Sequence, residues 1–229
     1  MSNIILKSDI IKDNYTDYIT EKFDLQVTNE IISQIPMINI EELDSFEWNI
    51  GLICGNSGSG KSTILKHLGE IIEPSYDYNK CIVSQFPHLS EQEVCDLLSS
   101  VGLSSIPIWL HKPHELSNGE KARLDICWYL ANAKQGSFVL IDEFSSVINR
   151  NASQSMSYAL QRYVRNKNIK VILASCHFDI IEWLNPDWIF NLNKQHDGGC
   201  DIEHYIYNET KTYKSVDEKD VLTKNFNIN

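Results

Sequence analysis

The sequence has no apolar run long enough to cross a bilayer, and its basic residues are outnumbered by its acidic ones. Lys and Arg total 20 against 31 Asp and Glu, so the formal net charge is −11 at pH 7. A chain this acidic is not attracted broadly to nucleic acid or to anionic lipid. The sequence leaves open whether a local basic patch is formed by Arg162, Arg165, Lys167 and Lys170, although a solvated helix end is the simpler interpretation. Nucleic acid is therefore a partner that the charge does not support.

Signals for disulfides, secretion and repeats are also missing. The six cysteines show no CxxC spacing, several lie inside apolar runs as small buried residues do, and no signal peptide is seen. We therefore expect free thiols and a cytoplasmic location. With 42% hydrophobic and 22% charged residues, the composition is typical of a globular protein. Its 229 residues suffice for one domain, 1–229, with a substantial core.

The strongest motif that is present is a glycine-rich stretch at residues 55–63. It follows the apolar run Trp48–Cys54, precedes a predicted helix, and matches G-x-x-x-x-G-K-[ST] at every fixed position. Glycines there let consecutive N–H groups curl around a phosphate chain, and the helix start adds the positive end of its dipole. Lys61 is expected to reach the β- and γ-phosphates, and the Ser62 hydroxyl to ligate Mg²⁺. The residues predicted to bind a nucleoside triphosphate are Gly55, Asn56, Ser57, Gly58, Ser59, Gly60, Lys61, Ser62 and Thr63.

Alternating apolar strands and helices are predicted along the rest of the chain. The predicted strands are 23–27, 46–50, 81–84, 137–141, 171–175, 188–190 and 202–207. Helices are predicted from Lys61 through Ile72, after the capping box Ser90–Glu93, from 118 past Trp128, and at 152–164 and 178–184. This alternation indicates a wound α/β sheet, with 137–141 as a central parallel strand and ligands at the carboxyl ends. Residues from about 208 to 229 form a polar tail.

Four polar residues follow predicted strands, at the edge where the phosphates would lie. Asp142 ends an apolar strand and is expected to hold Mg²⁺, and Glu143 beside it is expected to polarise the attacking water. Gln85 is expected to order the same water or contact the metal, and His177 to hydrogen-bond the γ-phosphate. Taken singly, Gln85 and His177 would be ordinary loop residues. The acidic pair downstream of a phosphate loop is a rarer combination.

In this order the motifs resemble those of the ATP-binding-cassette (ABC) ATPases, over residues 46 to 192. The phosphate loop, Gln85, the signature at 116–120, the Asp142–Glu143 pair and His177 all appear in the family's order. The signature is LSNGE where transporters more often have LSGGQ, and Asn149 replaces the usual aspartate of the D-loop, 146–149. The resemblance implies an α/β P-loop NTPase fold with a parallel-sheet core, a reduced helical lobe at about 86–116, and N-terminal antiparallel strands.

The resemblance also implies ATP and Mg²⁺ as ligands, hydrolysis of ATP, and a dimer. In such ATPases the nucleotide lies between the phosphate loop of one subunit and the signature of the other. Ser117, Asn118 and Gly119 would therefore complete the γ-phosphate site of a second chain. Binding would close the dimer, and hydrolysis would open it and move a partner protein. The sequence leaves open whether two identical or two related chains pair.

The interval between Gln85 and Ser117 is short, which leaves no room for the long coiled coil of chromosome-maintenance ATPases and weakens a transport role. Residues 48–53, 101–109 and 175–188 are similar to a group of microbial and phage ABC ATPases that are often joined to an acetyltransferase-like domain. We therefore expect a non-transport role beside a separate partner, with an acetyltransferase-like enzyme as the candidate. The alternatives are the ATP-binding subunit of an ABC exporter and a nucleotide-dependent binding switch with little turnover.

For the other candidate residues, structural interpretations are favoured. Phe23 could stack on adenine, but a packing role is preferred. His196, Cys200 and His204 are spaced by four, yet the alternation at 202–207 favours a surface strand over a metal site. Cys176 is expected to face the core and not to act with His177 as a nucleophile.

Overall fold

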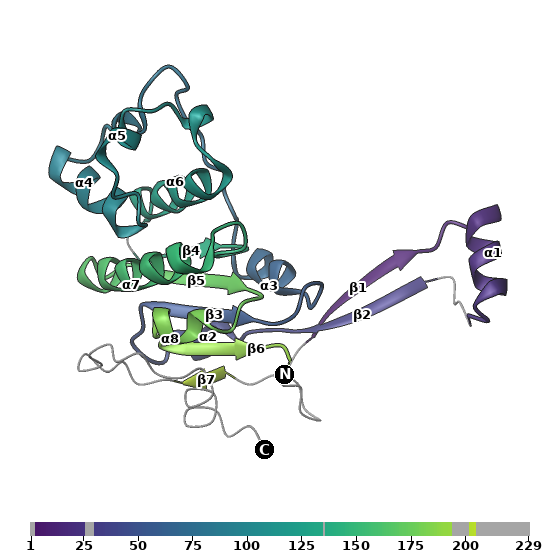
Figure 1. The fold of residues 1–229 in the computed structure, drawn as a ribbon. Helices are drawn as coiled ribbons and strands as arrows, with labels where there is room; N and C mark the ends of the chain where they lie inside the picture. The colour runs from purple at the N-terminus through teal and green to yellow at the C-terminus, as the bar shows by residue number, and fades with distance from the viewer. Residues whose placement is uncertain (1–2, 26–29, 135, 194–201, 205–229) are drawn as a thin grey trace.

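The computed structural model describes residues 3–25, 30–134, 136–193 and 202–204 (Figure 1). Its centre is a five-stranded sheet in the order β4-β5-β3-β6-β7. The parallel strands are β3 (Ile50–Cys54), β4 (Phe138–Ile141), β5 (Lys170–Ser175) and β6 (Trp188–Asn191), and β7 (Ile202–His204) pairs antiparallel with β6. The predicted wound α/β sheet is confirmed, and the carboxyl ends of its parallel strands lie at one edge.

Helices cover both faces of this sheet. The helices are α2 (Ile40–Leu43), α3 (Lys61–Leu68), α4 (Glu91–Ser100), α5 (Ile106–Trp109), α6 (Asn118–Ala131), α7 (Arg150–Asn166) and α8 (Ile180–Leu184), with 3-10 turns η1 (Ile82–Ser84) and η2 (Pro113–Glu115). Along β5, Val171 and Leu173 pack with side chains of α4, α6, α7 and α8, whereas Ile172 and Ala174 pack with those of α3. Because side chains alternate and both faces are buried, the strands are continuous apolar runs.

A buried ion pair holds the starts of β3 and β6. Asp187 Oδ2 accepts hydrogen bonds from the backbone N–H groups of Asn49 and Ile50, both at 2.8 Å. The Arg165 guanidinium donates to both oxygens of the same carboxylate at 2.9 Å, and the two side chains are only 12% and 11% exposed. A single carboxylate therefore accepts hydrogen bonds from two backbone amides at the start of β3 and from one guanidinium.

Separate contacts engage three residues of the possible basic patch, Arg165, Lys167 and Lys170. Arg165 is paired with Asp187, Lys167 Nζ lies 3.6 Å from a Glu93 carboxylate oxygen, and Lys170 Nζ lies 5.0 Å from the Trp48 ring centroid. These contacts spread the positive charge over different neighbours. The interpretation as a solvated helix end is wrong for Arg165, which is buried in an ion pair, and for Lys170, which begins β5.

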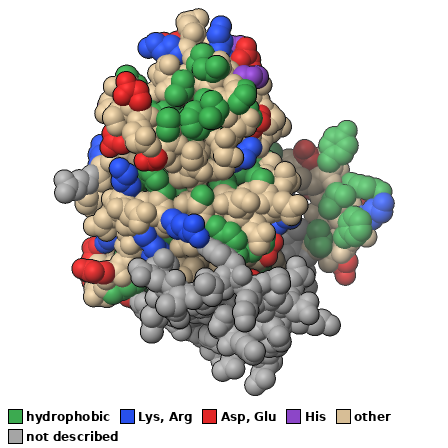
Figure 2. Space-filling view, turned by 60° about the vertical axis from the view of Figure 1, so that its left-hand side comes forward, with side chains coloured by type: hydrophobic (Ala, Val, Ile, Leu, Met, Phe, Trp, Pro, Cys, Tyr) green, Lys and Arg blue, Asp and Glu red, His purple; other side chains and the backbone are tan. Residues whose placement is uncertain are grey.

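The N-terminal antiparallel strands exist as a projecting arm. β1 (Asn3–Asp9) pairs with β2 (Glu30–Pro36), and α1 (Asn14–Lys22) lies at the far end of the pair. Figure 1 shows this arm extending away from the sheet beside α3, and Figure 2 shows apolar side chains gathered on it. Its exposed large apolar side chains are Ile5, Leu6, Ile11, Tyr15, Tyr18, Ile19, Phe23 and Leu25.

Two of the predicted strands are wrong in kind. Residues 82–84 form η1, because the Ser84 N–H donates to the Cys81 carbonyl and closes a tight turn where a ladder was expected. Phe23 ends α1, where its own N–H bonds back to Ile19, so 23–25 is not a strand, and 26–27 lies outside the described residues.

Other predictions are wrong in position. β4 lies at the edge of the sheet as described, although its side chains are as buried as those of a central strand, because α6 packs beside it. β3 begins at Ile50, so 46–49 is not strand. α3 ends at Leu68 before Gly69, which leaves Ile71 and Ile72 outside the helix. The helices opened by Ser90 and Ser117 are confirmed, and the predicted capping box at Ser90 is formed. Ser117 forms a second capping box with Glu120, which the sequence analysis did not predict.

Candidate functional site

The phosphate loop lies between the buried strand β3 and the helix α3, as its motif requires. Gly60 is the N-cap of α3 and has φ +97°, and Gly58 has φ +78°, a region that side chains with a Cβ rarely adopt. A Cβ on Gly60 would also approach Ile35 Cδ1 to 2.8 Å. No side chain caps the first turn of α3, so its N–H groups remain available for an anion.

Lys61 folds back across this loop. Its ammonium donates to the carbonyl of Gly55 at 2.8 Å and to that of Asn56 at 2.7 Å. These two bonds hold the cation at the mouth of the loop, beside the glycine amides. A phosphate chain placed there would find the cation and the helix start on the same side.

The acidic pair follows β4 on a loop with unusual backbone geometry. The Glu143 N–H donates to Asp142 Oδ1 at 2.8 Å, and Glu143 itself has φ +49°. The Phe144 N–H donates to the Ala174 carbonyl at 2.8 Å, and Ser175 Oγ donates to the Phe144 carbonyl at 3.0 Å. The ends of β4 and β5 are thus tied together, which fixes both carboxylates at the carboxyl edge of the sheet.

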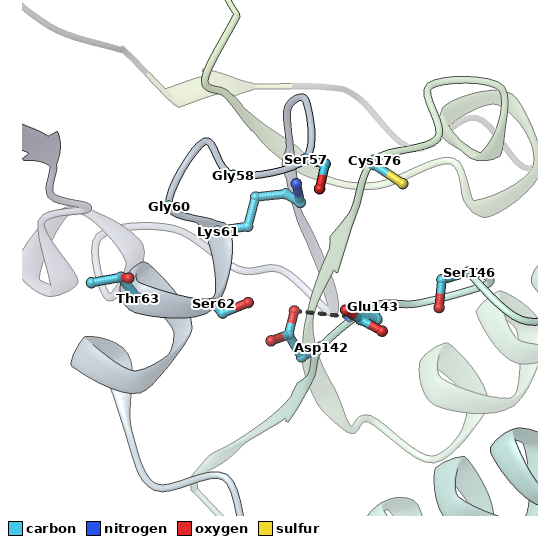
Figure 3. Close-up of a pocket in the computed structure, with 10 residues that line it drawn as sticks. All are labelled: Ser57, Gly58, Gly60, Lys61, Ser62, Thr63, Asp142, Glu143, Ser146 and Cys176. Atoms are coloured by element: carbon cyan, nitrogen blue, oxygen red, sulfur yellow. Dashed lines mark hydrogen bonds between the residues drawn. The ribbon is translucent and has the colours of Figure 1, made fainter. Parts of the chain in front are cut away.

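These two segments meet at one cavity of about 320 Å³. Figure 3 shows Lys61 and Ser62 on one side of it and Asp142 and Glu143 on the other. The cavity is lined by Ser57, Gly58, Gly60, Lys61, Ser62, Thr63, Asp142, Glu143, Ser146 and Cys176. The structure therefore brings together most of the predicted phosphate-loop residues and both predicted acids.

Two lining residues were not predicted for this site. Ser146 belongs to the segment after the acidic pair, and Cys176 is the first residue after β5. The expectation that Cys176 faces the core is wrong, because Ser175 is 1% exposed and takes the inward position while Cys176 is exposed. Every residue from 171 to 175 is buried, so the sequence of β5 carried no alternation that could have set this phase.

Gln85 and His177 are not among the residues that line the cavity. His177 is half-buried, and its backbone N–H donates to Ser175 Oγ at 3.1 Å. The Gln85 side-chain amide is engaged by the loop before η1, where it accepts from the Asp77 N–H at 2.9 Å and donates to the Asp77 carbonyl at 2.8 Å. Their roles at the γ-phosphate and the metal stay predictions.

The signature residues lie at the start of α6. Ser117 is the N-cap of α6, and its hydroxyl donates to Glu120 Oε2 at 2.7 Å, which together with the Ser117 N–H lowers the pKa of the Glu120 carboxyl. Ser117 and Asn118 are exposed, and a Cβ on Gly119 would lie 3.4 Å from the Val147 carbonyl. Within one chain these residues do not line the cavity of the phosphate loop.

Phe23 and the possible metal cluster are placed away from this site or outside the description. Phe23 is 61% exposed at the end of α1, on the arm that projects from the sheet (Figure 1). His196 and Cys200 lie outside the described residues, as does the tail from 208 to 229, while His204 ends β7. No group of three metal-ligating side chains is found in the part of the chain that the structure describes.

The residues at the cavity nevertheless fit Mg²⁺. This ion prefers oxygen ligands, keeps several waters, and is usually held by one or two protein groups together with substrate phosphates. The Ser62 hydroxyl and the Asp142 carboxylate line the same cavity, so a cluster of three protein ligands is not needed.

A glycine-rich phosphate loop between a parallel strand and a helix, facing an acidic pair at the end of another strand, defines a P-loop NTPase. Residues 6–189 match the family model described as the Rad17 P-loop domain. The chain belongs to that family.

The curated relatives include an ATP-dependent flippase and an ATP-binding protein of a lipoprotein-releasing system. The chain is 27% identical over 176 residues to the ATP-dependent lipid A-core flippase of Neisseria gonorrhoeae, covering 56% of this chain and 28% of the relative. It is 28% identical over 145 residues to the lipoprotein-releasing system ATP-binding protein LolD 1 of Rhodospirillum rubrum, covering 57% of this chain and 62% of the relative. The chain thus spans less than two thirds of either relative.

The fold is similar to that of solved ABC cassettes. The dimeric post-hydrolysis structure of the ATP-binding cassette MJ0796 bound to ADP and Pi matches with a TM-score of 0.51 and 17% identity, covering 70% of this chain and 87% of that one. The expected P-loop NTPase fold with ABC-like architecture is confirmed. No helix in the described part of the chain has the length and apolar character of a membrane span.

Proposed function

We propose that the chain binds Mg·ATP at the phosphate-loop cavity and hydrolyses it to ADP and phosphate. The observation that carries this proposal is the meeting of Lys61 and Ser62 with Asp142 and Glu143 around one cavity. The first pair belongs to a helix start that attracts phosphate, and the second supplies the carboxylates that phosphoryl transfer to water needs.

Each residue has a distinct role in this reaction. The loop amides and Lys61 hold the β- and γ-phosphates, which places the γ-phosphorus beside the acidic pair. Ser62 and Asp142 would hold Mg²⁺, which neutralises charge on the phosphate oxygens when it is bound. Glu143 accepts a hydrogen bond from the attacking water and so increases its nucleophilicity. Ser117, Asn118 and Gly119 are assigned to the γ-phosphate of a second chain.

Exposure of the signature supports a dimeric site. Ser117 and Asn118 face solvent in one chain, and neither of them lines the cavity. The related cassette bound to ADP and Pi is itself dimeric. A second copy facing the first would bring the start of α6, with its positive dipole end, to the γ-phosphate.

Phosphate release from ATP tests the proposed reaction. Lys61→Ala should abolish tight ATP binding, and Glu143→Gln should keep binding but lower turnover by about a hundredfold or more. Lys66→Ala is the matched control, because Lys66 is exposed on the same helix and should leave both quantities unchanged. Equal turnover in the parent chain and Glu143→Gln would mean that this carboxylate carries no catalysis, as expected for a binding switch.

The mass of the complex in solution tests the dimer. Glu143→Gln with Mg²⁺ and ATP should elute at twice the mass of the nucleotide-free chain, and adding Ser117→Arg should return it to the monomer mass. A monomer that turns over ATP at the full rate would contradict the dimeric site.

We propose that the partner protein of this ATPase is not a membrane transporter. The short stretch between Gln85 and α6 supports this, and the sequence resemblance points to an acetyltransferase-like enzyme. The names of the curated relatives favour a second candidate, the ATP-binding subunit of an ABC transporter. Co-purification from the native host separates them: a multispanning membrane protein supports the second candidate and a non-membrane enzyme supports the first.

A further inference from the structure

One buried tyrosine links the loop that holds Gln85 to the helix that carries Ser117. Tyr76 is 9% exposed, and its hydroxyl donates to Asp125 Oδ1 on α6 at 2.9 Å. Burial first, and the Asp125 charge second, raise the pKa of the Tyr76 phenol far above its usual value. The hydroxyl therefore stays protonated and can donate to the carboxylate at any working pH.

Lys121 completes this contact from the same helix. Its ammonium is paired with Asp125 Oδ1 and lies 4.5 Å from the centroid of the Tyr76 ring. Ser117, Lys121 and Asp125 are spaced by four, so they lie on one face of α6. Tyr76 thus packs against the face of α6 that follows from its N-cap, the signature residue Ser117.

The backbone of the same loop also forms hydrogen bonds with the side-chain amide of Gln85. Gln85 binds the N–H and the carbonyl of Asp77, the residue after Tyr76, and also donates to the carbonyls of Lys80 at 3.1 Å and Cys81 at 3.3 Å. All of its amide atoms are therefore engaged with the loop. A displacement of Tyr76 necessarily moves the backbone to which Gln85 is bonded.

We propose that Tyr76 is a positioning residue that links Gln85 to the signature helix α6 through its hydrogen bond to Asp125. A second subunit that binds at Ser117 and shifts α6 would then pull the 76–81 loop and reorient Gln85. The inference rests on the proposed ATPase, because Gln85 matters only if it acts on the water or the metal. Tyr76 itself touches neither.

Amide exchange in the nucleotide-free chain tests the link without any turnover. Tyr76→Phe removes only the hydroxyl and its hydrogen bond to the charged Asp125. The Asp77 N–H, which donates to Gln85 Oε1, should then exchange about tenfold faster. Tyr78→Phe is the matched control, since Tyr78 is 54% exposed on the same loop, and it should leave the rate unchanged. Equal exchange in the parent chain and Tyr76→Phe would overturn the proposal.

Turnover measurements then ask whether Tyr76 acts through Gln85. Tyr76→Phe should lower kcat about tenfold and leave KM for ATP unchanged, because the phosphate loop is not touched. The double variant Tyr76→Phe/Gln85→Ala should be no slower than Gln85→Ala alone. Effects that multiply would show that Tyr76 does not act through Gln85 and would overturn the proposal.

A conservative change at the acceptor distinguishes positioning from general loss of packing. Asp125→Asn keeps an oxygen for the Tyr76 hydroxyl and should retain more activity than Asp125→Ala, whereas equal losses would contradict the link. A parent chain that releases no phosphate would refute the proposed function, while the exchange rates of Asp77 would still decide whether Tyr76 holds Gln85.

Discussion

The phosphate loop and the N-terminal arm touch at Ile35, whose side chain lies against Gly60. Behind the loop, β3 is buried along its whole length, and Ile64 and Leu65 of α3 pack into the core. At the far end of the arm, α1 buries no residue at all. The loop therefore takes its shape from packing on both sides, whereas the arm depends on strand pairing and on its root.

This contrast matters because a phosphate site needs fixed amides. The left-handed backbone at Gly58 and Gly60 is kept in place by the strand before it and the helix after it. Among the described residues, the arm packs on the core at its root, where Ile35 is 7% exposed and Ile4 packs against the same buried cluster as α3. Changes near the loop should therefore alter global stability, and changes at the tip of the arm should not.

The largest effect is expected where β3 is anchored. Asp187→Ala would leave Arg165 buried without its carboxylate and would remove the acceptor of the Asn49 and Ile50 amides, which should cost about 3–5 kcal/mol of unfolding free energy. Asp179→Ala is the control, because its pair with Arg150 is more exposed, with side chains 44% and 38% exposed, and should contribute less, about 1 kcal/mol. Urea unfolding measures both, and similar losses would mean that the buried pair does not stabilise β3.

A smaller effect is expected at the root of the arm. Ile35→Ala removes a buried side chain between β2 and the phosphate loop and should cost about 2–4 kcal/mol. Ile11→Ala changes a side chain that is 82% exposed and should stay within about 0.5 kcal/mol. If both variants unfold at the urea concentration of the parent chain, the root is not part of the core and the two regions are alike.

Much of the phosphate site could be predicted because its chemistry is local in sequence. The loop needs fixed residues at fixed spacing between a strand and a helix, and Asp142 is identified by the apolar run before it. The actual partners of Gln85 could not be predicted, because they come from a loop whose path depends on Tyr76 packing against α6. The orientation of the Cys176 side chain was predicted wrongly for a related reason, because β5 is buried on both faces and shows no alternation.

The far end of the arm was predicted wrongly because its apolar residues are not buried. Periodicity assigns a strand or helix by assuming that apolar side chains face a core, and Phe23 and Leu25 face solvent. The edge position of β4 could not be predicted either. Because α6 buries β4, this edge strand has the apolar composition of a central strand.

The smallest expected difference compares two helix caps of the same kind. Ser90 caps α4 and Asp13 caps α1, each in a capping box, but α4 buries Val94, Leu97 and Leu98 while α1 buries nothing. Ser90→Ala should therefore cost about 1 kcal/mol of global stability. Asp13→Ala should leave the unfolding midpoint unchanged and only speed exchange of the Thr16 N–H, which donates to Asp13 Oδ1 at 2.8 Å.

The pH dependence of stability separates the caps of α4 and α1 further. The Ser90 N–H, followed by the Ser90 hydroxyl, holds the pKa of the Glu93 carboxyl below its usual 4.5, so its contribution is present above that pH and is lost as the pH falls through the lowered value. The pKa of Asp13 is lowered in the same sense by the Thr16 N–H. The difference in urea midpoint between the parent chain and Glu93→Gln should vanish as the pH is lowered from 6. The midpoint of Asp13→Asn should equal that of the parent chain at every pH. A pH-dependent gap for Asp13→Asn would mean that α1 is coupled to the core after all.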